Sequence, residues 1–259
     1  MDLKQKLMMT PLYDWLGKRS YAQSGEDIVA DIELGKKKKG FYVDIGAYHP
    51  KMFSNTYLFY KKGWSGLCVD PNPKMEELFA KARPRDVFLN MGVGKGGKAG
   101  GGRSLHSGRD DGGEAVEYFM FEDGAANTFS AEQAKKNQEE AGRKLKGKRM
   151  VAVLPLKTIF DKYLPKGQKI DLLSVDVEGM DLEVLRSNDW KKYRPEIIIA
   201  EDLEFDFDRY VNGVRLPRSQ ARPRNDGGVG VAKFLGERGY KLNDKTPYSL
   251  IFTKEKPRS

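Results

Sequence analysis

The feature that most constrains the fold is an alternation of short apolar segments with segments of helical pattern. Residues 41–45, 66–70 and 87–89 are apolar runs of strand length, and helical patterns follow at 54–62 and from Asn72-Pro73 onward. Parallel neighbouring strands need such a crossover between them. The alternation therefore predicts an α/β fold, in which helices cover both faces of a parallel sheet.

The rest of the chain continues this pattern around two irregular segments. We expect further strands at 116–121, 151–154, 170–176 and 196–200, and two short ones near residues 240 and 248–253. Helices are expected at 130–145, where Ser130 and Gln133 form a capping box, at 158–164, after residue 180 and at 231–238. Ten of the 22 residues at 92–113 are glycine, which predicts a loop insertion.

The 259 residues fit one domain, with a helical N-terminal extension at 1–39, a core at 40–204 and an arginine-rich segment with a closing helix and strands at 205–259. A single cysteine, Cys68, excludes an internal disulfide and a cysteine-based zinc site. His49 and His106 are too far apart in sequence to indicate a histidine-rich metal site. Lacking a long apolar run or a signal-like start, the chain is expected to be soluble and cytoplasmic.

The net charge of +9, from 46 Lys and Arg against 37 Asp and Glu, leaves two interpretations. One is an anionic partner, such as a nucleic acid, a nucleotide-sugar or an anionic glycan lipid. The other is a solvated basic surface, since much of the charge lies in short runs such as Lys36–Lys39.

Two aspartates near strand ends carry most of the chemical information. Asp44 precedes the glycine turn at Gly46, and Asp70 ends the next strand. Ligands of open α/β sheets bind beyond the carboxyl ends of the strands, where an acid can accept hydrogen bonds from both ribose hydroxyls. The loop that begins at Asp44 lacks the Gly-x-Gly-x-x-Gly pattern that would hold a pyrophosphate there, which favours a phosphate-free ligand such as S-adenosylmethionine (SAM).

Six ordered motifs within residues 20–204 resemble the FkbM-type SAM-dependent methyltransferases. These are Ser20–Asp27, Gly40–Ala47, Ser54–Thr56, Val69–Pro73, Asn127–Phe129 and Val175–Gly179. The resemblance implies a Rossmann-like class I methyltransferase fold: a sheet of seven mostly parallel strands with an antiparallel last strand. It also implies O-methylation, often of sugars, polysaccharides or secondary metabolites.

The resemblance further implies roles for particular residues. Asp44, Gly46 and Ala47 match the SAM loop, Asp70 matches the ribose acid, and Asp176, Glu178 and Gly179 match an Asp-x-Glu-Gly block. The candidate cofactor-binding residues are Asp44, Gly46, Ala47, Tyr48, Asp70, Asn72 and Asn90. Asn90 would meet the adenine or cap the backbone.

Three residues are candidates for catalysis. His49 follows the cofactor loop and could act as a general base, or it could make a structural hydrogen bond. Asp176 and Glu178 could bind the acceptor hydroxyl or remove its proton, or they could cap the following helix.

Two further groups of charged residues could bind a ligand. Glu201 and Asp202 end the next strand and, with Asp176, could hold Mg²⁺ or Ca²⁺; alternatively they are solvated acids. A cluster of arginines could clamp an anionic acceptor or belong to a solvated loop. These are Arg209, Arg215, Arg218, Arg222 and Arg224.

The leading hypothesis is a SAM-dependent O-methyltransferase acting on a hydroxyl of a sugar, glycan or related metabolite. A nucleic-acid methyltransferase is the second, favoured by the charge but without an Asn-Pro-Pro-aromatic block after the 170–176 strand. The third is a protein of the same fold that binds SAM or a partner without turnover.

Overall fold

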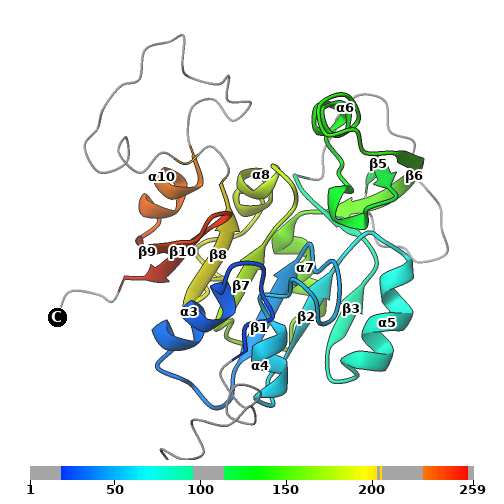
Figure 1. The fold of residues 1–259 in the computed structure, drawn as a ribbon. Helices are drawn as coiled ribbons and strands as arrows, with labels where there is room; N and C mark the ends of the chain where they lie inside the picture. The colour runs from blue at the N-terminus through cyan, green and yellow to red at the C-terminus, as the bar shows by residue number, and fades with distance from the viewer. Residues whose placement is uncertain (1–18, 96–113, 203–204, 206–229, 256–259) are drawn as a thin grey trace, which may run out of the picture.

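The computed structural model describes residues 19–95, 114–202, 205 and 230–255, and its centre is a seven-stranded sheet (Figure 1). The strand order is β3-β2-β1-β7-β8-β10-β9. The strands are β1 (Phe41–Ile45), β2 (Ser65–Val69), β3 (Val87–Leu89), β7 (Leu172–Val175), β8 (Ile197–Glu201), β9 (Tyr240–Lys245) and β10 (Ser249–Lys254).

The direction of the strands agrees with the expected α/β fold. The pairs β1–β2, β2–β3, β1–β7 and β7–β8 are parallel, whereas β10 is antiparallel to both β8 and β9. The order turns back between β1 and β7, so the carboxyl ends of these two strands flank the switch point where open sheets bind ligands. The predicted mostly parallel sheet with an antiparallel last strand is confirmed.

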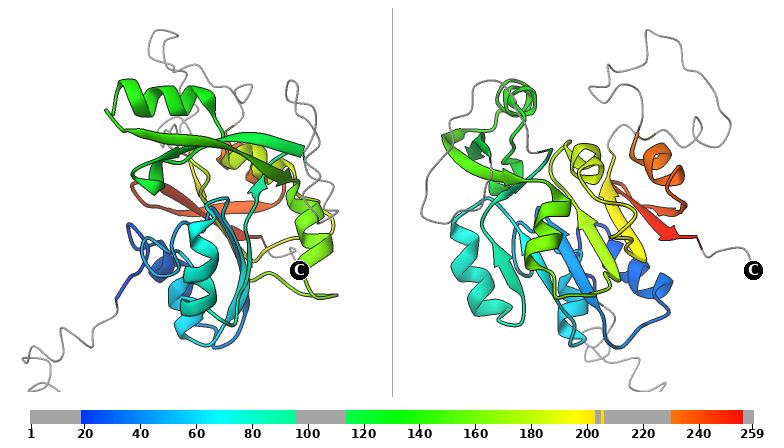
Figure 2. Two further views of the ribbon diagram at one scale, coloured as in Figure 1. Left: turned by 90° about the vertical axis from the view of Figure 1, so that its right-hand side faces the viewer. Right: turned by 180° about the vertical axis from the view of Figure 1, so that it is seen from behind.

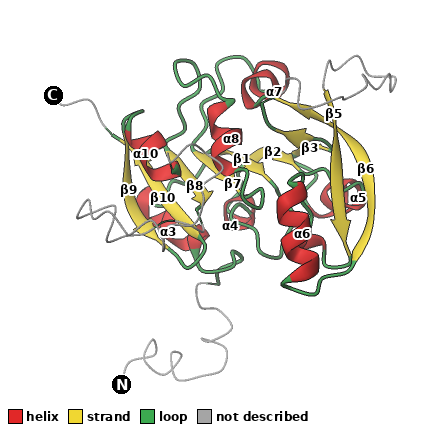
Figure 3. Cartoon of the chain, turned by 90° about the horizontal axis from the view of Figure 1, so that it is seen from above, coloured by secondary structure: helices red, strands yellow, loops and turns green. Residues whose placement is uncertain are grey.

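Helices cover both faces of this sheet (Figures 2 and 3). On one face lie α3 (Glu26–Glu33), α4 (Tyr57–Lys61) and α5 (Lys74–Ala82); on the other lie α7 (Leu156–Tyr163), α8 (Asp181–Arg186) and α10 (Val231–Gly236). Successive residues of β1 alternate between the two cores: Tyr42 packs with the first set of helices, and Val43 and Ile45 with the second.

A second sheet, which the sequence did not predict as a separate unit, adjoins the main one. It has the order β4-β6-β5, built from β4 (Gly92–Val93), β5 (Glu114–Phe121) and β6 (Leu145–Leu154). The short helices η1 (Gly124–Ala126) and α6 (Ala131–Glu139) complete it. We call this unit, residues 92–154 as far as they are described, the roof (Figure 1).

The roof corrects two sequence predictions. Residues 92–93, placed in the loop insertion, form β4, which pairs in parallel with Val153 and Leu154 of β6. The helix expected to reach Leu145 ends at Glu139, because Gly142 at φ 61° turns the chain and Leu145 already belongs to β6. The N-cap at Ser130 is confirmed, since its Oγ accepts a hydrogen bond from the amide of Gln133, with 3.1 Å between the atoms. The capping box is not completed, because the Ser130 amide donates to Thr128 Oγ1 and the Gln133 side chain donates to Asn137.

Several expectations concern residues outside the described ranges. These are the N-terminal extension up to residue 18, His106, most of the glycine-rich segment and the five arginines from Arg209 to Arg224. Within the described part of residues 1–39, the α-helix is α3. The division of the chain into one domain stays a prediction.

Candidate functional site

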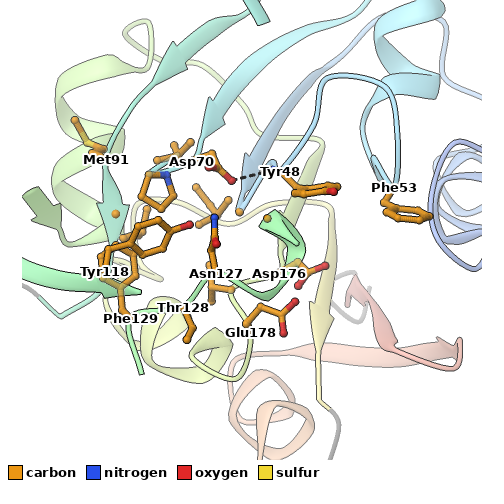
Figure 4. A pocket seen from close by; sticks show the side chains of 18 of the residues that line it. Tyr48, Phe53, Asp70, Met91, Tyr118, Asn127, Thr128, Phe129, Asp176 and Glu178 are labelled. Carbon is orange, nitrogen blue, oxygen red and sulfur yellow. Dashed lines mark hydrogen bonds between the residues drawn. The ribbon is translucent and has the colours of Figure 1, made fainter. Parts of the chain in front are cut away.

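A pocket opens between the carboxyl ends of the main strands and the roof (Figure 4). About 800 Å³ of space lies within it, with open solvent included, so the pocket is a cleft that is open to solvent. The main sheet contributes the residues after β1, β2, β3 and β7, and the roof contributes β5 and the segment around η1. The principal lining residues are Ile45, Gly46, Tyr48, Phe53, Asp70, Met91, Tyr118, Asn127, Thr128, Phe129, Asp176 and Glu178.

The turn after β1 needs a glycine for two reasons. Gly46 has φ 80°, and a Cβ at this position would lie 1.7 Å from the carbonyl oxygen of Asp176. The amides of Gly46 and Ala47 both donate to the carbonyl oxygen of Val69, which ties the turn to β2. The chain can therefore pass close to β7 and leave the pocket open above it.

Asp70 faces this pocket from the end of β2. Its Oδ2 accepts a hydrogen bond from the amide of Tyr48 (2.9 Å), and its Oδ1 accepts one from the amide of Asn72 (2.8 Å). Burial raises the pKa of the Asp70 carboxyl to about 7, although these two hydrogen bonds oppose the shift. The acid predicted to bind ribose is thus oriented by backbone groups at the wall of the pocket.

Asp44 lies on the opposite face of β1, away from the pocket. Its Oδ2 accepts a hydrogen bond from Thr56 Oγ1, 2.5 Å away, and burial raises its pKa while the charge of Arg83 lowers it. Arg83 is fully buried, donates to Thr56 Oγ1 and pairs through Nε with Asp86 Oδ2 at 2.6 Å. This network supports the turn after β1 from the side away from the pocket.

The segment from Tyr48 to Phe53 forms the rim of the pocket. Tyr48 and Phe53 both have positive φ, 43° and 53°, which is uncommon for bulky side chains. Their rings lie nearly parallel, with 6.3 Å between centroids and 17° between planes. The Phe53 side chain is exposed, so the two rings form an aromatic ledge beside the opening.

The His49 side chain makes hydrogen bonds within this loop and does not line the pocket. Its Nδ1 accepts hydrogen bonds from the amides of Lys51 (3.1 Å) and Met52 (3.0 Å). Partial burial lowers its pKa, with a smaller contribution from Lys51. This is the structural hydrogen bonding that the sequence left as the alternative to a general base.

Asn72 and Asn90 also make backbone contacts near Asp70. Asn72 Oδ1 accepts a hydrogen bond from the amide of Lys74, the first residue of α5, whose N-cap is Pro73. Asn90 donates through Nδ2 to the carbonyl oxygen of Asp70, 2.9 Å away. Both side chains therefore shape the end of β2.

Asp176 and Glu178 line the pocket on the side opposite Asp70 (Figure 4). Burial raises the pKa of Glu178 to about 7, and the charge of Asp176 contributes to this shift. Asp176 itself is exposed to solvent. Glu178 has φ 53°, which is also uncommon. Neither residue caps α8, whose N-cap is Met180, so the capping alternative does not hold.

More carboxyls lie behind this pair. Asp181 is 3% exposed, and its Oδ1 accepts from the amide of Glu201 at 3.0 Å. Burial, with the nearby charges of Asp176 and Asp181, raises the pKa of Glu201 to about 10. Among the described residues no three His, Cys, Asp or Glu side chains are arranged to hold a metal ion. Asp176, Glu201 and Asp202 are therefore not assigned as metal ligands.

The sequence missed the roof's part of the site. Tyr118 of β5 is buried, burial raises the pKa of its hydroxyl above the usual range, and that hydroxyl is hydrogen-bonded to the Asn127 side chain. Phe129 packs against Tyr118 with ring centroids 4.7 Å apart, and Met91 lies on the same wall. The Asn127–Phe129 motif was visible in the sequence, but nothing local placed Tyr118 beside it.

The structure thus brings some of the predicted site residues together. Those at the pocket are Gly46, Tyr48, Asp70, Asp176 and Glu178, whereas Asp44, Ala47, His49, Asn72 and Asn90 do not line it. Their proposed roles in binding or catalysis stay predictions.

Comparison with known proteins agrees with this geometry. In the described part of the chain, no helix has the length and apolar character needed to cross a membrane. A search of curated protein sequences found no match. The methyltransferase FkbM domain, however, matches residues 44–242, which is more than half of the chain and includes the whole pocket apart from Gln23. The chain therefore belongs to the FkbM methyltransferase family.

Proposed function

We propose that this methyltransferase uses SAM to methylate a hydroxyl group of a sugar, glycan or related metabolite. The observation that carries the proposal is Asp70, an oriented carboxylate at the end of β2, in a pocket that also contains the glycine turn of β1. A carboxylate in this place suits the two hydroxyls of a ribose.

The lining residues fit the parts of SAM. Met91, Tyr118 and Phe129 offer apolar and aromatic surface for an adenine ring near Asp70. Asp176 and Glu178 offer negative charge on the other side, where the positive charge of the SAM sulfonium would be favoured. When bound, SAM supplies an electrophilic methyl carbon.

Glu178 is the proposed general base. Its carboxylate lines the pocket, and its pKa of about 7 allows it to take up a proton near neutral pH. Removing the proton of an acceptor hydroxyl makes that oxygen a better nucleophile as transfer proceeds. Asp176, beside it, would hold the hydroxyl by accepting a hydrogen bond.

The aromatic ledge supports a sugar as acceptor. A pyranose has an apolar face of C–H groups, which packs on the faces of aromatic rings, and hydroxyls at its edge, which bond to carboxylates. Tyr48 and Phe53 provide the rings, and Asp176 and Glu178 lie across the opening from them (Figure 4).

The first experiment is a thermal-shift titration with S-adenosylhomocysteine (SAH), with NAD⁺ as the control. Saturating SAH at about 100 times its Kd stabilises by roughly 2.7 kcal/mol, which raises the Tm by about 5–10 °C. A panel of sugars, nucleotide-sugars and oligosaccharides is then tested for methyl transfer from SAM. No shift with SAH in a folded sample would contradict the proposed cofactor.

The same experiments separate the two other functions. Methylation of RNA but not of sugars, with salt-dependent RNA binding, would indicate a nucleic-acid methyltransferase. SAH binding without turnover on any acceptor would indicate a binding protein of the same fold.

A further inference from the structure

Carboxyl groups gather on one side of the pocket in a chain that is basic overall. Asp176 and Glu178 line the pocket, and Asp181 and Glu201 lie behind them. Val175 of β7 is paired with Ala200 of β8, so Asp176 and Glu201 follow neighbouring positions at the ends of adjacent strands. The amide of Glu201 in turn donates to Oδ1 of Asp181. The chain carries a net charge of +9, so this acidity is local to the site.

Few described groups neutralise this cluster. Arg143 lowers the pKa of Glu178, whereas Asp123 raises it, and Asp44 and Glu26 both raise the pKa of Asp176. Among the described residues, no hydrogen bond or ion pair engages the Asp176 carboxylate.

Among the residues that the structure describes, one carboxyl oxygen of Asp181 and one of Glu201 have no hydrogen-bond partner. These are Oδ2 of Asp181, a residue that is 3% exposed, and Oε2 of Glu201. The charge of Asp176 acts on the carboxyls of both, so these oxygens belong to the same cluster. A buried polar atom without a partner is costly, and such atoms in a native protein commonly mark a place for a bound group.

We propose that Asp176, Glu178, Asp181 and Glu201 form a subsite for positive charge, which makes the enzyme bind its cationic methyl donor more tightly than the neutral product. This inference rests on the proposed function, since it assumes that SAM occupies the pocket. It adds a selectivity between donor and product that SAM binding alone does not require.

The chemistry of the donor gives the physical reason. The sulfonium of SAM carries a positive charge that is lost when the S–CH₃ bond breaks and the O–CH₃ bond forms. The acceptor's hydroxyl proton passes to Glu178, and the sulfur of SAH is a neutral thioether. The electrostatic attraction to the carboxylates therefore applies to the donor and vanishes in the product. Release of SAH is favoured, which limits product inhibition.

The test is calorimetric titration with SAM, with SAH and with sinefungin, an unreactive analogue that carries an amine at the transfer position. SAM and SAH share the ribose and the α-amino group, so the ratio of their Kd values isolates the sulfonium. At about pH 8 we expect SAM and sinefungin to bind on the order of tenfold more tightly than SAH, the effect of one pKa unit. Repeating the titrations in buffers of different ionisation enthalpy should show that the two cationic ligands release more protons.

Variants test whether the four carboxyl groups cause the difference between the affinities for SAM and SAH. Asp176→Asn should bring the ratio of the SAM and SAH affinities close to one with little change for SAH. Glu201→Gln, which mimics a neutral carboxyl, should keep SAH binding and reduce the extra proton release. Glu139→Gln removes an exposed carboxylate of α6 and should leave both quantities unchanged. SAH binding reports whether each variant has folded.

The outcomes separate the inference from the proposed function. Equal affinity and equal proton release for SAM, sinefungin and SAH would overturn the cationic subsite while leaving the SAM-binding function intact. An unchanged affinity ratio in Asp176→Asn would also overturn it. Failure of all three ligands to bind the folded wild-type protein would overturn the proposed function itself.

Discussion

The amide of Tyr48 donates a hydrogen bond to Oδ2 of Asp70, with 2.9 Å between the two atoms. It joins the rim of the pocket to the acid at the end of β2. Tyr48 reaches this position with φ 43°, so the contact is made at some conformational cost. The position of the acid and the shape of the rim therefore depend on each other.

Asp70→Asn should weaken SAH binding by at least about tenfold. The amide cannot accept from both backbone donors and the ribose as the carboxylate does, and hydrogen bonds to a charged group are worth about 1.5–3 kcal/mol each. Calorimetric titration measures the loss. Glu117→Gln, an exposed residue of β5, is the matched control. Unchanged SAH affinity in Asp70→Asn would remove this residue from the ribose site.

His49→Ala and His49→Asn should separate a structural role from a catalytic one. An asparagine oxygen can accept the amide hydrogen bonds that His49 Nδ1 accepts, but asparagine cannot act as a base near neutral pH. We expect His49→Asn to keep most of the turnover and His49→Ala to raise the Kd for SAH. Loss of turnover in both variants with normal SAH binding would instead restore His49 as the base.

Glu178→Gln should lower kcat by about 10²–10⁴, the usual contribution of a general base. The wild-type rate should rise with pH through about 7, because the base must be deprotonated and burial raises the pKa of Glu178 to about 7. The rise in rate with pH should be absent in Glu178→Gln. The acceptor found in the sugar panel provides the assay. An unchanged pH profile in the variant would assign the proton transfer to another group.

Arg83→Met should destabilise the fold because it leaves Asp86 buried without its ionic partner. Loss of one member of a buried pair costs about 3–5 kcal/mol, which lowers the Tm by about 10 °C in a domain of this size. Both side chains of the pair are fully buried. Lys192→Met breaks the exposed pair with Asp161 and should barely change the Tm. Equal Tm values in the two variants would contradict a supporting role for the buried network.

The main sheet was predictable because its signals are local. Apolar runs such as 41–45 and 196–200 specify buried strands by themselves, and Asp70 follows its strand directly. Whether Asp44 faces the ligand could not be predicted in the same way. Strand periodicity places Asp44 beside Tyr42, but the sequence does not say which face of β1 meets the ligand. The three-dimensional contacts with Thr56 and Arg83 decide it.

The roof was hard to predict because its contacts are long-range. β4 has two residues, and its partner β6 lies about sixty residues later, beyond a segment rich in glycine. Tyr118 reaches the pocket through the antiparallel pairing of β5 with β6, which no local pattern encodes. The hydrogen-bond partners of His49 could not be predicted for a related reason, since they are backbone amides rather than chemically distinctive side chains.

The short ladder between β4 and β6 has an evolutionary consequence. The roof leaves the main body at Val93 and returns at Leu154, and these two residues are paired neighbours in the same core. Because its entry and exit are adjacent, the intervening chain can lengthen, shorten or change composition without altering the spacing of the seven-stranded sheet. One wall of the pocket can thus change in length and composition while the strand end that carries Asp70 keeps its position.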